Sequence, residues 1–200
     1  MPKLAVGSNQ FSMTEKFTEI ITSSVDGRLD RQCLDILGRL DKDHSVISVV
    51  YFFAAGSDEV CLLNGHILQS TTASALRDCS LVSYVPQRPM GGRLVAEILY
   101  IKGNPEVEMR EDYVVLRSGG CEEILTQGIR FPSSGDIGEQ SAKVFDRIRN
   151  ILERESFAVS DIVRQWNYIS HITAVSEGVQ NYQLFNDARS DFYSGAEGVD

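Results

Sequence analysis

Four polar side chains near the end of the chain have types and a spacing that suit the binding of a small anion. Tyr182, Asn186, Arg189 and Tyr193 follow one another at intervals of four, three and four residues, which places them along one stripe of a helix. A polar stripe beside an apolar one either lines a cleft or forms the solvent edge of an ordinary amphipathic helix. The first alternative predicts ligand contacts from Tyr182, Asn186 and Arg189.

A second group lies some twenty residues earlier. Arg164, Trp166 and Tyr168 alternate within a run from Ile162 to Ile169 that is typical of a strand, so the three side chains are predicted to share one strand face. An arginine beside two aromatic rings suits a carboxylate ligand. The alternative is a face covered by another unit or subunit, with Arg164 paired to a buried acid. As the only tryptophan, Trp166 is predicted to lie in the core.

Two successive units are predicted to position these residues, and the first covers residues 1–103. Its helix from Arg28 to Leu40 carries apolar residues on one face, and Asp26 and Gly27 precede it as turn or cap residues. Ser57 is expected to cap a second helix over 58–69. Strands are predicted at 46–53, 81–85 and 93–102, with a turn rich in Gly and Pro at 86–92.

The second unit covers residues 104–200. A hairpin is predicted from strands at 107–109 and 113–116, followed by an irregular stretch over 118–134. Gly135 and Asp136 open a long helix, and after the 162–169 strand a last helix runs from Val179 to Tyr193. Both units place strands, a helix, a strand and a helix in the same order, which indicates an internal duplication whose second copy lacks its closing strands. The alternative is one continuous mixed sheet with helices on one face. The tail from Ser194 is expected to fray.

Three segments of the second unit resemble the YjgF/RidA family, and most closely its chorismatase branch. Residues 117–120 with Gly135, Asp136 and Gln140 resemble an S-G loop followed by a G-D-x-x-x-Q helix start. Residues 164–168 resemble an R-x-W-N-Y strand, and residues 182–192 resemble a Y-x-x-F-N-x-x-R-x-x-F helix. Asn186 also matches the asparagine of the imine deaminase helix. The resemblance covers about residues 107 to 193.

This resemblance implies an α+β fold of the chorismate-mutase-like (YjgF/RidA) type, a mixed sheet with helices on one face in two pseudo-repeated units, the second incomplete. It implies cleavage of chorismate to pyruvate and a cyclic or aromatic carboxylic acid, without a metal or organic cofactor. The ligand-binding residues it suggests are Tyr182, Asn186, Arg189 and Arg164. Two arginines would hold the two carboxylates, and an acid would protonate the enol ether.

The sequence departs from the family pattern in two places. It ends before the G-Y-P-A-A segment that follows the family's last helix, so the chain alone is expected to be inactive and its catalytic residues remain unknown. Cys121, Glu122 and Glu123 stand where the family has small neutral residues, and acids lining a pocket would repel the chorismate dianion. Two other function classes therefore stay open. One is an imine deaminase or small-ligand-binding oligomer, and the other is a non-catalytic interaction domain with self-association, most simply as a dimer.

The composition of the chain narrows the remaining classes of function. The chain has 200 residues, 42% of them hydrophobic, and no apolar run is long enough to span a membrane. No leader is recognised at the start, so a cytoplasmic location with no membrane partner is expected. The four cysteines and three histidines are scattered, so we expect reduced thiols and no metal site. Some members of this superfamily carry older labels as endoribonucleases or translation inhibitors. The net negative charge of this chain supports neither function.

The acidic balance generates a prediction about nucleic acids. The formal net charge is -9, and no basic cluster interrupts it. Because phosphate contacts by Lys and Arg supply most of the affinity for nucleic acids, RNA and DNA are expected to bind weakly or not at all at physiological salt. Fluorescence anisotropy with a labelled RNA measures this. A salt-sensitive, sub-micromolar dissociation constant would show that a local basic site exists.

Overall fold

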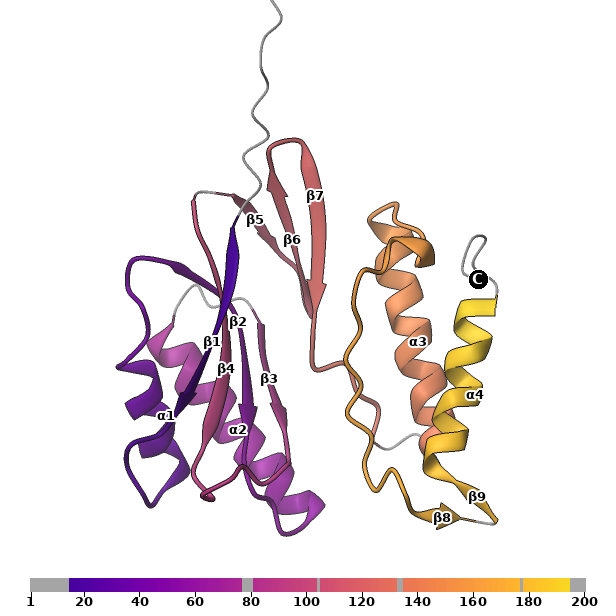
Figure 1. Cartoon of the computed structure of the whole chain (residues 1–200), viewed down its shortest axis with the longest axis horizontal. Helices are drawn as coiled ribbons and strands as arrows, with labels where there is room; N and C mark the ends of the chain where they lie inside the picture. Colours follow the sequence, from indigo (N-terminus) through magenta and orange to yellow (C-terminus); the bar gives the residue numbers. More distant parts are fainter. Residues whose placement is uncertain (1–14, 77–80, 104, 133–134, 177, 195–200) are drawn as a thin grey trace, which may run out of the picture. The chain divides into compact units, whose positions relative to one another are not determined.

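The protein is a mixed α+β molecule made of two compact units. The computed structural model describes residues 15–76, 81–103, 105–132, 135–176 and 178–194. Clustering of contacts separates Met1–Gly128 from Ile129–Asp200, and each unit is described by itself (Figure 1). The tail that we predicted to fray lies almost entirely outside the described residues.

The first unit is built on a four-stranded mixed sheet. Its strands are β1 (Lys16–Thr22), β2 (Ser45–Phe52), β3 (Leu81–Val85) and β4 (Val95–Ile101), in the order β1-β4-β2-β3. β4 runs antiparallel to both of its neighbours, whereas β2 and β3 are parallel. A parallel pair requires a crossover connection, and the helix between β2 and β3 supplies it. The three strands predicted for this unit are confirmed.

Two helices cover one face of this sheet, as predicted. They are α1 (Leu29–Leu37) and α2 (Asp58–Ala75), and both lie against the sheet in Figure 1. Ser57 caps α2, because its side chain accepts a hydrogen bond from Val60 N at 3.3 Å. No side chain caps α1, where Arg28 takes the N-cap position. The shared core joins both helices to the sheet through buried residues that include Cys33, Ile36, Leu68, Val49, Tyr51, Ala96, Ile98 and Tyr100.

A second sheet follows, and it corrects one prediction. It is an antiparallel meander of β5 (Glu106–Met109), β6 (Tyr113–Ser118) and β7 (Cys121–Thr126). The hairpin of β5 and β6 is confirmed, but the stretch after Ser118 is not irregular throughout. Gly119 and Gly120 have φ values of 61° and 82°, and two positive values in a two-residue loop suit a tight hairpin turn. The Gly-Gly pair was therefore the missed signal for β7.

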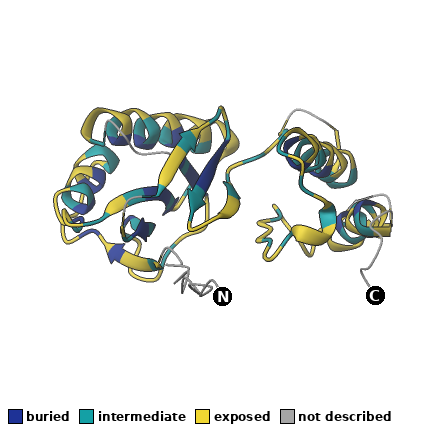
Figure 2. Cartoon of the chain, turned by 90° about the horizontal axis from the view of Figure 1, so that it is seen from above, coloured by how far each residue is buried: buried dark blue, intermediate teal, exposed yellow. Residues whose placement is uncertain are grey.

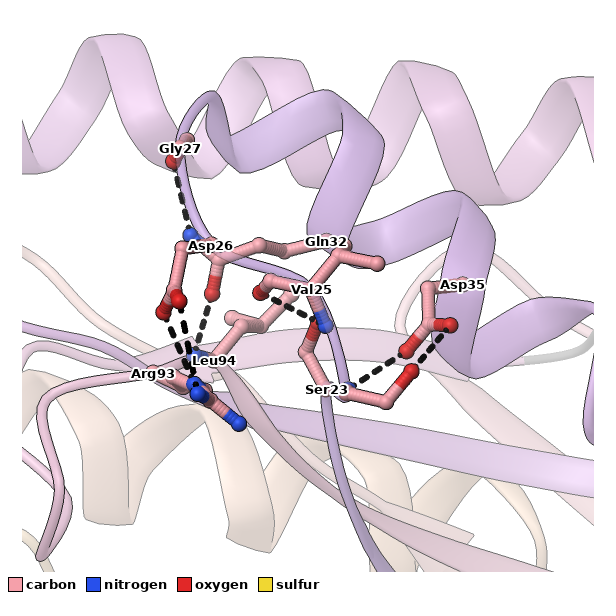
Figure 3. A network of polar contacts seen from close by, with 9 residues as sticks. Ser23, Val25, Asp26, Gly27, Gln32, Asp35, Arg93 and Leu94 are labelled. Atoms are coloured by element: carbon pink, nitrogen blue, oxygen red, sulfur yellow. Dashed lines mark hydrogen bonds and ion pairs between the residues drawn. The ribbon is translucent and has the colours of Figure 1, made fainter.

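A buried amide ties the start of α1 to the sheet (Figure 3). The Gln32 side chain donates to Gly27 O at 2.8 Å and accepts from Leu94 N at 2.8 Å. The loop before α1 is held further by Ser23 N, which donates to Leu94 O at 2.9 Å. Arg93 and Asp26 add an ion pair at 2.8 Å on the exposed side. Gln32 is 9% exposed, so both of its bonds are shielded from water.

The second unit is a pair of helices with a long connection. These helices are α3 (Ile137–Arg154) and α4 (Asn181–Ser194), and α3 begins where Asp136 accepts a hydrogen bond from Glu139 N at 2.9 Å. The connection contains a 3-10 turn (Val159–Asp161) and the two-residue strands β8 (Val175–Ser176) and β9 (Val179–Gln180). The last helix therefore starts at Asn181 and not at Val179. None of the described helices is long and apolar enough to cross a membrane.

The predicted strand from Ile162 to Ile169 is wrong. The residues that pack inward on the helix pair are Ile162 and Ile169, with Gln165 half-buried between them. Their spacing of three and four residues is not the period of two that a strand requires. Val163 is 99% exposed and Trp166 is 74% exposed, so the prediction that Trp166 lies in the core is also wrong. Residues favourable for strands do not form one unless a neighbouring strand pairs with them.

The boundary between the compact units falls at Gly128, whereas the predicted units meet at Gly103. The hairpin of β5 and β6, assigned to the second unit from the sequence, therefore belongs to the first compact unit. Among the described residues of the second unit, β8 and β9 are the only strands. The internal duplication remains a prediction.

The Gln32 amide provides a test of the first unit. Replacing Gln32 with leucine keeps the volume but leaves Leu94 N without its acceptor in a buried position. An unsatisfied buried donor costs about 1–3 kcal/mol, so we expect a loss of that size in the free energy of unfolding, measured by urea denaturation. The control is Gln69→Leu on α2, where the side chain is half-buried and bonds to no other described residue. Equal effects of the two variants would contradict this role for Gln32.

Candidate carboxylate-binding site

The start of α4 is fixed by the connection that precedes it. Asn181 N donates to Ala174 O at 2.9 Å, and Tyr182 N donates to Ile172 O at 3.0 Å. The Asn181 side chain donates to His171 O at 3.0 Å. These bonds satisfy backbone donors that a helix start leaves unpaired. The rotation of α4, and therefore the direction of each stripe, depends on this anchoring.

The apolar stripe of α4 is buried against α3. Phe185 and Phe192 are 7% and 3% exposed, and Ala188 packs beside them. Phe145 from α3 stacks on Phe192 with a centroid distance of 4.8 Å and lies 6.0 Å from Phe185. Figure 2 shows buried residues on both helices. Burial of this stripe places the polar stripe at the border between the helix pair and solvent.

The polar stripe changes in character along the helix. Tyr182 is 50% exposed and Arg189 is exposed, while Asn186 and Tyr193 are half-buried. From Tyr182 to Arg189 the helix rises about 10 Å, so these two side chains do not meet at one point. Tyr182 lies beside the His171–Ile172 turn, and Arg189 lies towards the C-terminal end of the helix.

The connection between the helices meets the stripe at Tyr193. The Tyr193 hydroxyl donates to Gln165 Oε1 at 2.7 Å, and Gln165 Nε2 donates to Asn167 Oδ1 at 2.8 Å. This chain of hydrogen bonds fixes the residues on either side of Gln165. Gln165 and Tyr193 were not among the predicted ligand-binding residues, although the spacing of four residues from Arg189 to Tyr193 was a signal for the latter.

Arg164 and Trp166 are neighbours in space although no strand holds them. The Arg164 guanidinium lies over the Trp166 ring at 5.7 Å from its centroid. Such a contact is attractive because the ring face carries negative potential. Tyr168, which is 57% exposed, was expected on the same face and has no such contact with Arg164 among those that the structure shows. The connection therefore brings two of the three predicted side chains together.

Two arginines at this border have no acidic partner among the described residues. Within the ranges that the structure describes, neither Arg164 nor Arg189 forms an ion pair, so the alternative of Arg164 paired to a buried acid is not observed. Burial raises the pKa of the Tyr193 hydroxyl, and the positive charge of Arg189 opposes that rise. Arg189 and Tyr193 are four residues apart on α4 and are therefore neighbours on one face of the helix, and Tyr193 in turn contacts Gln165 beside Arg164. We define this candidate site as Arg164, Gln165, Trp166, Arg189 and Tyr193.

The arrangement can bind anions, and none of its five residues is a carboxylic acid. The carboxyl groups whose pKa values are clearly displaced are those of Asp30, Asp35, Asp41 and Glu108, and hydrogen-bond donors lower all four. A lowered pKa keeps a carboxylate ionised at neutral pH, so none of the four donates a proton as a general acid does. They all belong to the first unit. No cluster of three His, Cys, Asp or Glu side chains suited to a metal ion occurs among the described residues.

The acidic loop of the first unit is neutralised by its surroundings. Arg117 pairs with Glu108 at 2.8 Å and with Glu122 at 3.2 Å, and Lys16 pairs with Glu123. These contacts raise the pKa of Arg117. Arg117, the arginine of the S-G loop, therefore differs from Arg164 and Arg189, because carboxylates already neutralise its charge. Cys33, Cys61 and Cys121 form no disulfide among the described residues, and Cys79 lies outside them.

Comparison with known proteins identifies one family. A family model described as chorismatase FkbO/Hyg5-like, N-terminal, matches residues 99–199, which is just over half of the chain. The match includes the connection with Arg164 and the whole of α4. No curated protein and no solved structure matches.

The Tyr193–Gln165 hydrogen bond provides a test of the site. Tyr193→Phe removes the hydroxyl and leaves half-buried Gln165 with one partner fewer. We expect the free energy of unfolding to fall by about 0.5–1.5 kcal/mol and the fluorescence of Trp166, the only tryptophan, to change. The matched control is Tyr182→Phe on the same stripe, since the Tyr182 hydroxyl bonds to no other described residue. If both variants left Trp166 fluorescence unchanged, the hydrogen bond would not order the connection.

Proposed function

Because the chain belongs to the chorismatase FkbO/Hyg5-like family, we propose that it is the N-terminal portion of a chorismatase-like protein that holds the carboxylates of chorismate. Chorismate carries two carboxylates, and arginines bind such groups through paired hydrogen bonds of defined direction. Arg164 and Arg189 are the arginines that suit this task. The observation that carries the proposal is their lack of any acidic partner among the described residues, within the family match.

The neighbouring side chains support an arginine in this role. The Trp166 ring contacts one face of the Arg164 guanidinium. The N–H edges of the guanidinium remain available to a carboxylate. Gln165 is held by Tyr193 and Asn167, so the backbone that carries Arg164 is restrained. A restrained side chain loses less entropy when the ligand binds.

The chemical step needs a further residue. Cleavage of chorismate to pyruvate and a cyclic or aromatic carboxylic acid requires an acid that protonates the enol ether. The displaced carboxyl groups of the first unit all have lowered pKa values. We propose that the proton donor is supplied by sequence that is not among these 200 residues, and we expect the 200-residue chain to bind chorismate without turning it over.

The acidic loop does not oppose this proposal. Glu122 and Glu123 would repel a dianion if their charges were free, but Arg117 and Lys16 pair with them. The net charge of -9 acts at long range and is screened beyond about 8–10 Å at physiological ionic strength.

A non-catalytic interaction domain is a second candidate function. It is favoured by the exposure of large apolar side chains in one stretch of the second unit, including Val163 at 99%, Trp166 at 74% and Val175 at 66%. Contiguous exposed apolar surface of this kind marks interaction sites in soluble proteins.

Isothermal titration with chorismate tests the first proposal. We expect binding by the chain as it stands, and about a tenfold loss of affinity or more in Arg164→Gln and in Arg189→Gln, because each removes a charge-assisted bond. The matched control is Arg154→Gln on α3, where the arginine is exposed and lies 3.9 Å from Glu155. Release of pyruvate is followed in parallel, and none is expected above background.

Two results would contradict the proposal. One is chorismate affinity that is unchanged in both arginine variants, since the site would then lie elsewhere. The other is clear pyruvate release by the chain alone, since the proton donor would then lie within these 200 residues.

A further inference from the structure

The connection between α3 and α4 exposes an unusual run of side chains. Val163 is almost fully exposed, and Trp166, Tyr168, Ile172 and Val175 are between 40% and 74% exposed. These residues lie within fifteen positions of one another. Large apolar side chains that are exposed singly need no explanation, but a contiguous group does.

The same run is nearly free of charge. Between Ile162 and Ser176, Arg164 is the only residue among Asp, Glu, Lys and Arg, whereas charged residues make up 24% of the chain. Depletion of charged residues together with enrichment in Trp, Tyr and Arg is the composition of an interface core. The run therefore has the chemistry of a surface that is covered in the working protein.

Five consecutive residues of the run have no backbone partner among the described residues. From Val163 to Asn167 no backbone group bonds to any other part of the chain that the structure describes. The residues are nonetheless favourable for a strand, which is why the sequence predicts one here. An extended segment with free N–H and C=O groups is a template for pairing with another strand.

The sequence of the segment is self-complementary about Trp166. Counting outwards, Gln165 and Asn167 are both amides, and Arg164 is matched by Tyr168. In an antiparallel pair of identical strands with the two-fold axis at Trp166, each of these residues stands opposite its counterpart.

We propose that residues 164–168 are a docking surface for the same segment of a second copy, with Trp166 at the two-fold axis. In this register the only cation of the segment faces an aromatic ring of the partner copy, so no like charges oppose one another. A symmetric dimer is the simplest closed assembly that such a surface forms.

The dimer is compatible with the arginine site. An aromatic ring contacts the face of a guanidinium, while a carboxylate bonds to its N–H edge. Arg164 therefore has room for both contacts. The inference does not depend on chorismate binding, because the argument uses only exposure, charge, free backbone and register.

Concentration-dependent mass and fluorescence test the proposal. Sedimentation equilibrium is expected to show a shift from 22.2 kDa towards twice that mass as the concentration rises through the micromolar range. Emission from Trp166, the only tryptophan, is expected to move to shorter wavelength over the same range because the ring becomes buried. A monomer of 22.2 kDa at every concentration would overturn the proposal.

Two variants of one residue test the register. Tyr168→Lys places a cation opposite Arg164 of the other copy, and with two such pairs in a dimer we expect about a tenfold weaker dimer. Tyr168→Glu places an anion there, and a tighter dimer is expected. Tyr182→Lys, at a side chain of similar exposure outside the segment, is the control and is expected to leave the dimer unchanged. If both Tyr168 variants changed dimerisation in the same direction, the register would be wrong.

Cross-linking tests the axis directly. In a Cys121→Ser background, which removes the exposed described thiol, Trp166→Cys is expected to form a disulfide-linked dimer under mild oxidation. Val175→Cys is the control, since that side chain is 66% exposed but lies away from the axis. Equal cross-linking at both positions would show non-specific association and would overturn the proposed interface.

Discussion

The packing of Phe145 between two rings of α4 is the contact on which the second unit depends. The unit has two helices and a long connection with few strand residues, so few backbone bonds tie its parts together. Phe145 stacks on Phe192 and lies near Phe185, and large aromatic rings carry much of the burial energy in small cores. Ile162 and Ile169 of the connection pack against this cluster. The position of Arg164 and the direction of the polar stripe on α4 both follow from it.

Polar side chains have different roles in the two units. In the first unit they are buried and saturated: Tyr51 bonds to Thr72 at 2.8 Å and to the Cys33 thiol at 3.3 Å. Tyr100 bonds to Glu19 at 3.0 Å, and its burial raises its pKa to about 12. Such groups hold one conformation and have no capacity left for a ligand. The arginines at the border of the second unit have unused donors, which is what recognition of an anion requires.

The sequence predicts those parts of the structure that are determined by residues close together in the chain, and it predicts less well those that depend on distant residues. The Ser57 cap, the amphipathic faces of α1 and α4 and the strand β3 follow from neighbouring residues, and they are confirmed. The segment with Trp166 was wrongly predicted because a strand needs a second strand, and the residues do not reveal whether one is present. The hydrogen bond from Tyr193 to Gln165 also escaped prediction, because the connection between the helices has no period that fixes its path. The resemblance implied a mixed α+β molecule, but it did not indicate that Gln165 and Tyr193 would lie at the site.

The central position of β4 has a consequence for the growing polypeptide. β4 pairs with β1 and β2, and Ile20 in β1 faces Glu97 in β4, so two strands that leave the ribosome early bond to one that leaves later. At about 5–20 residues per second, roughly 4–15 s separate the synthesis of these partners. During that interval β1 has no place in a sheet, because the other strands of its order reach it only through β4. The nascent first unit is therefore expected to be most exposed to chaperones and proteases before residue 101 emerges, and to close within a short time afterwards.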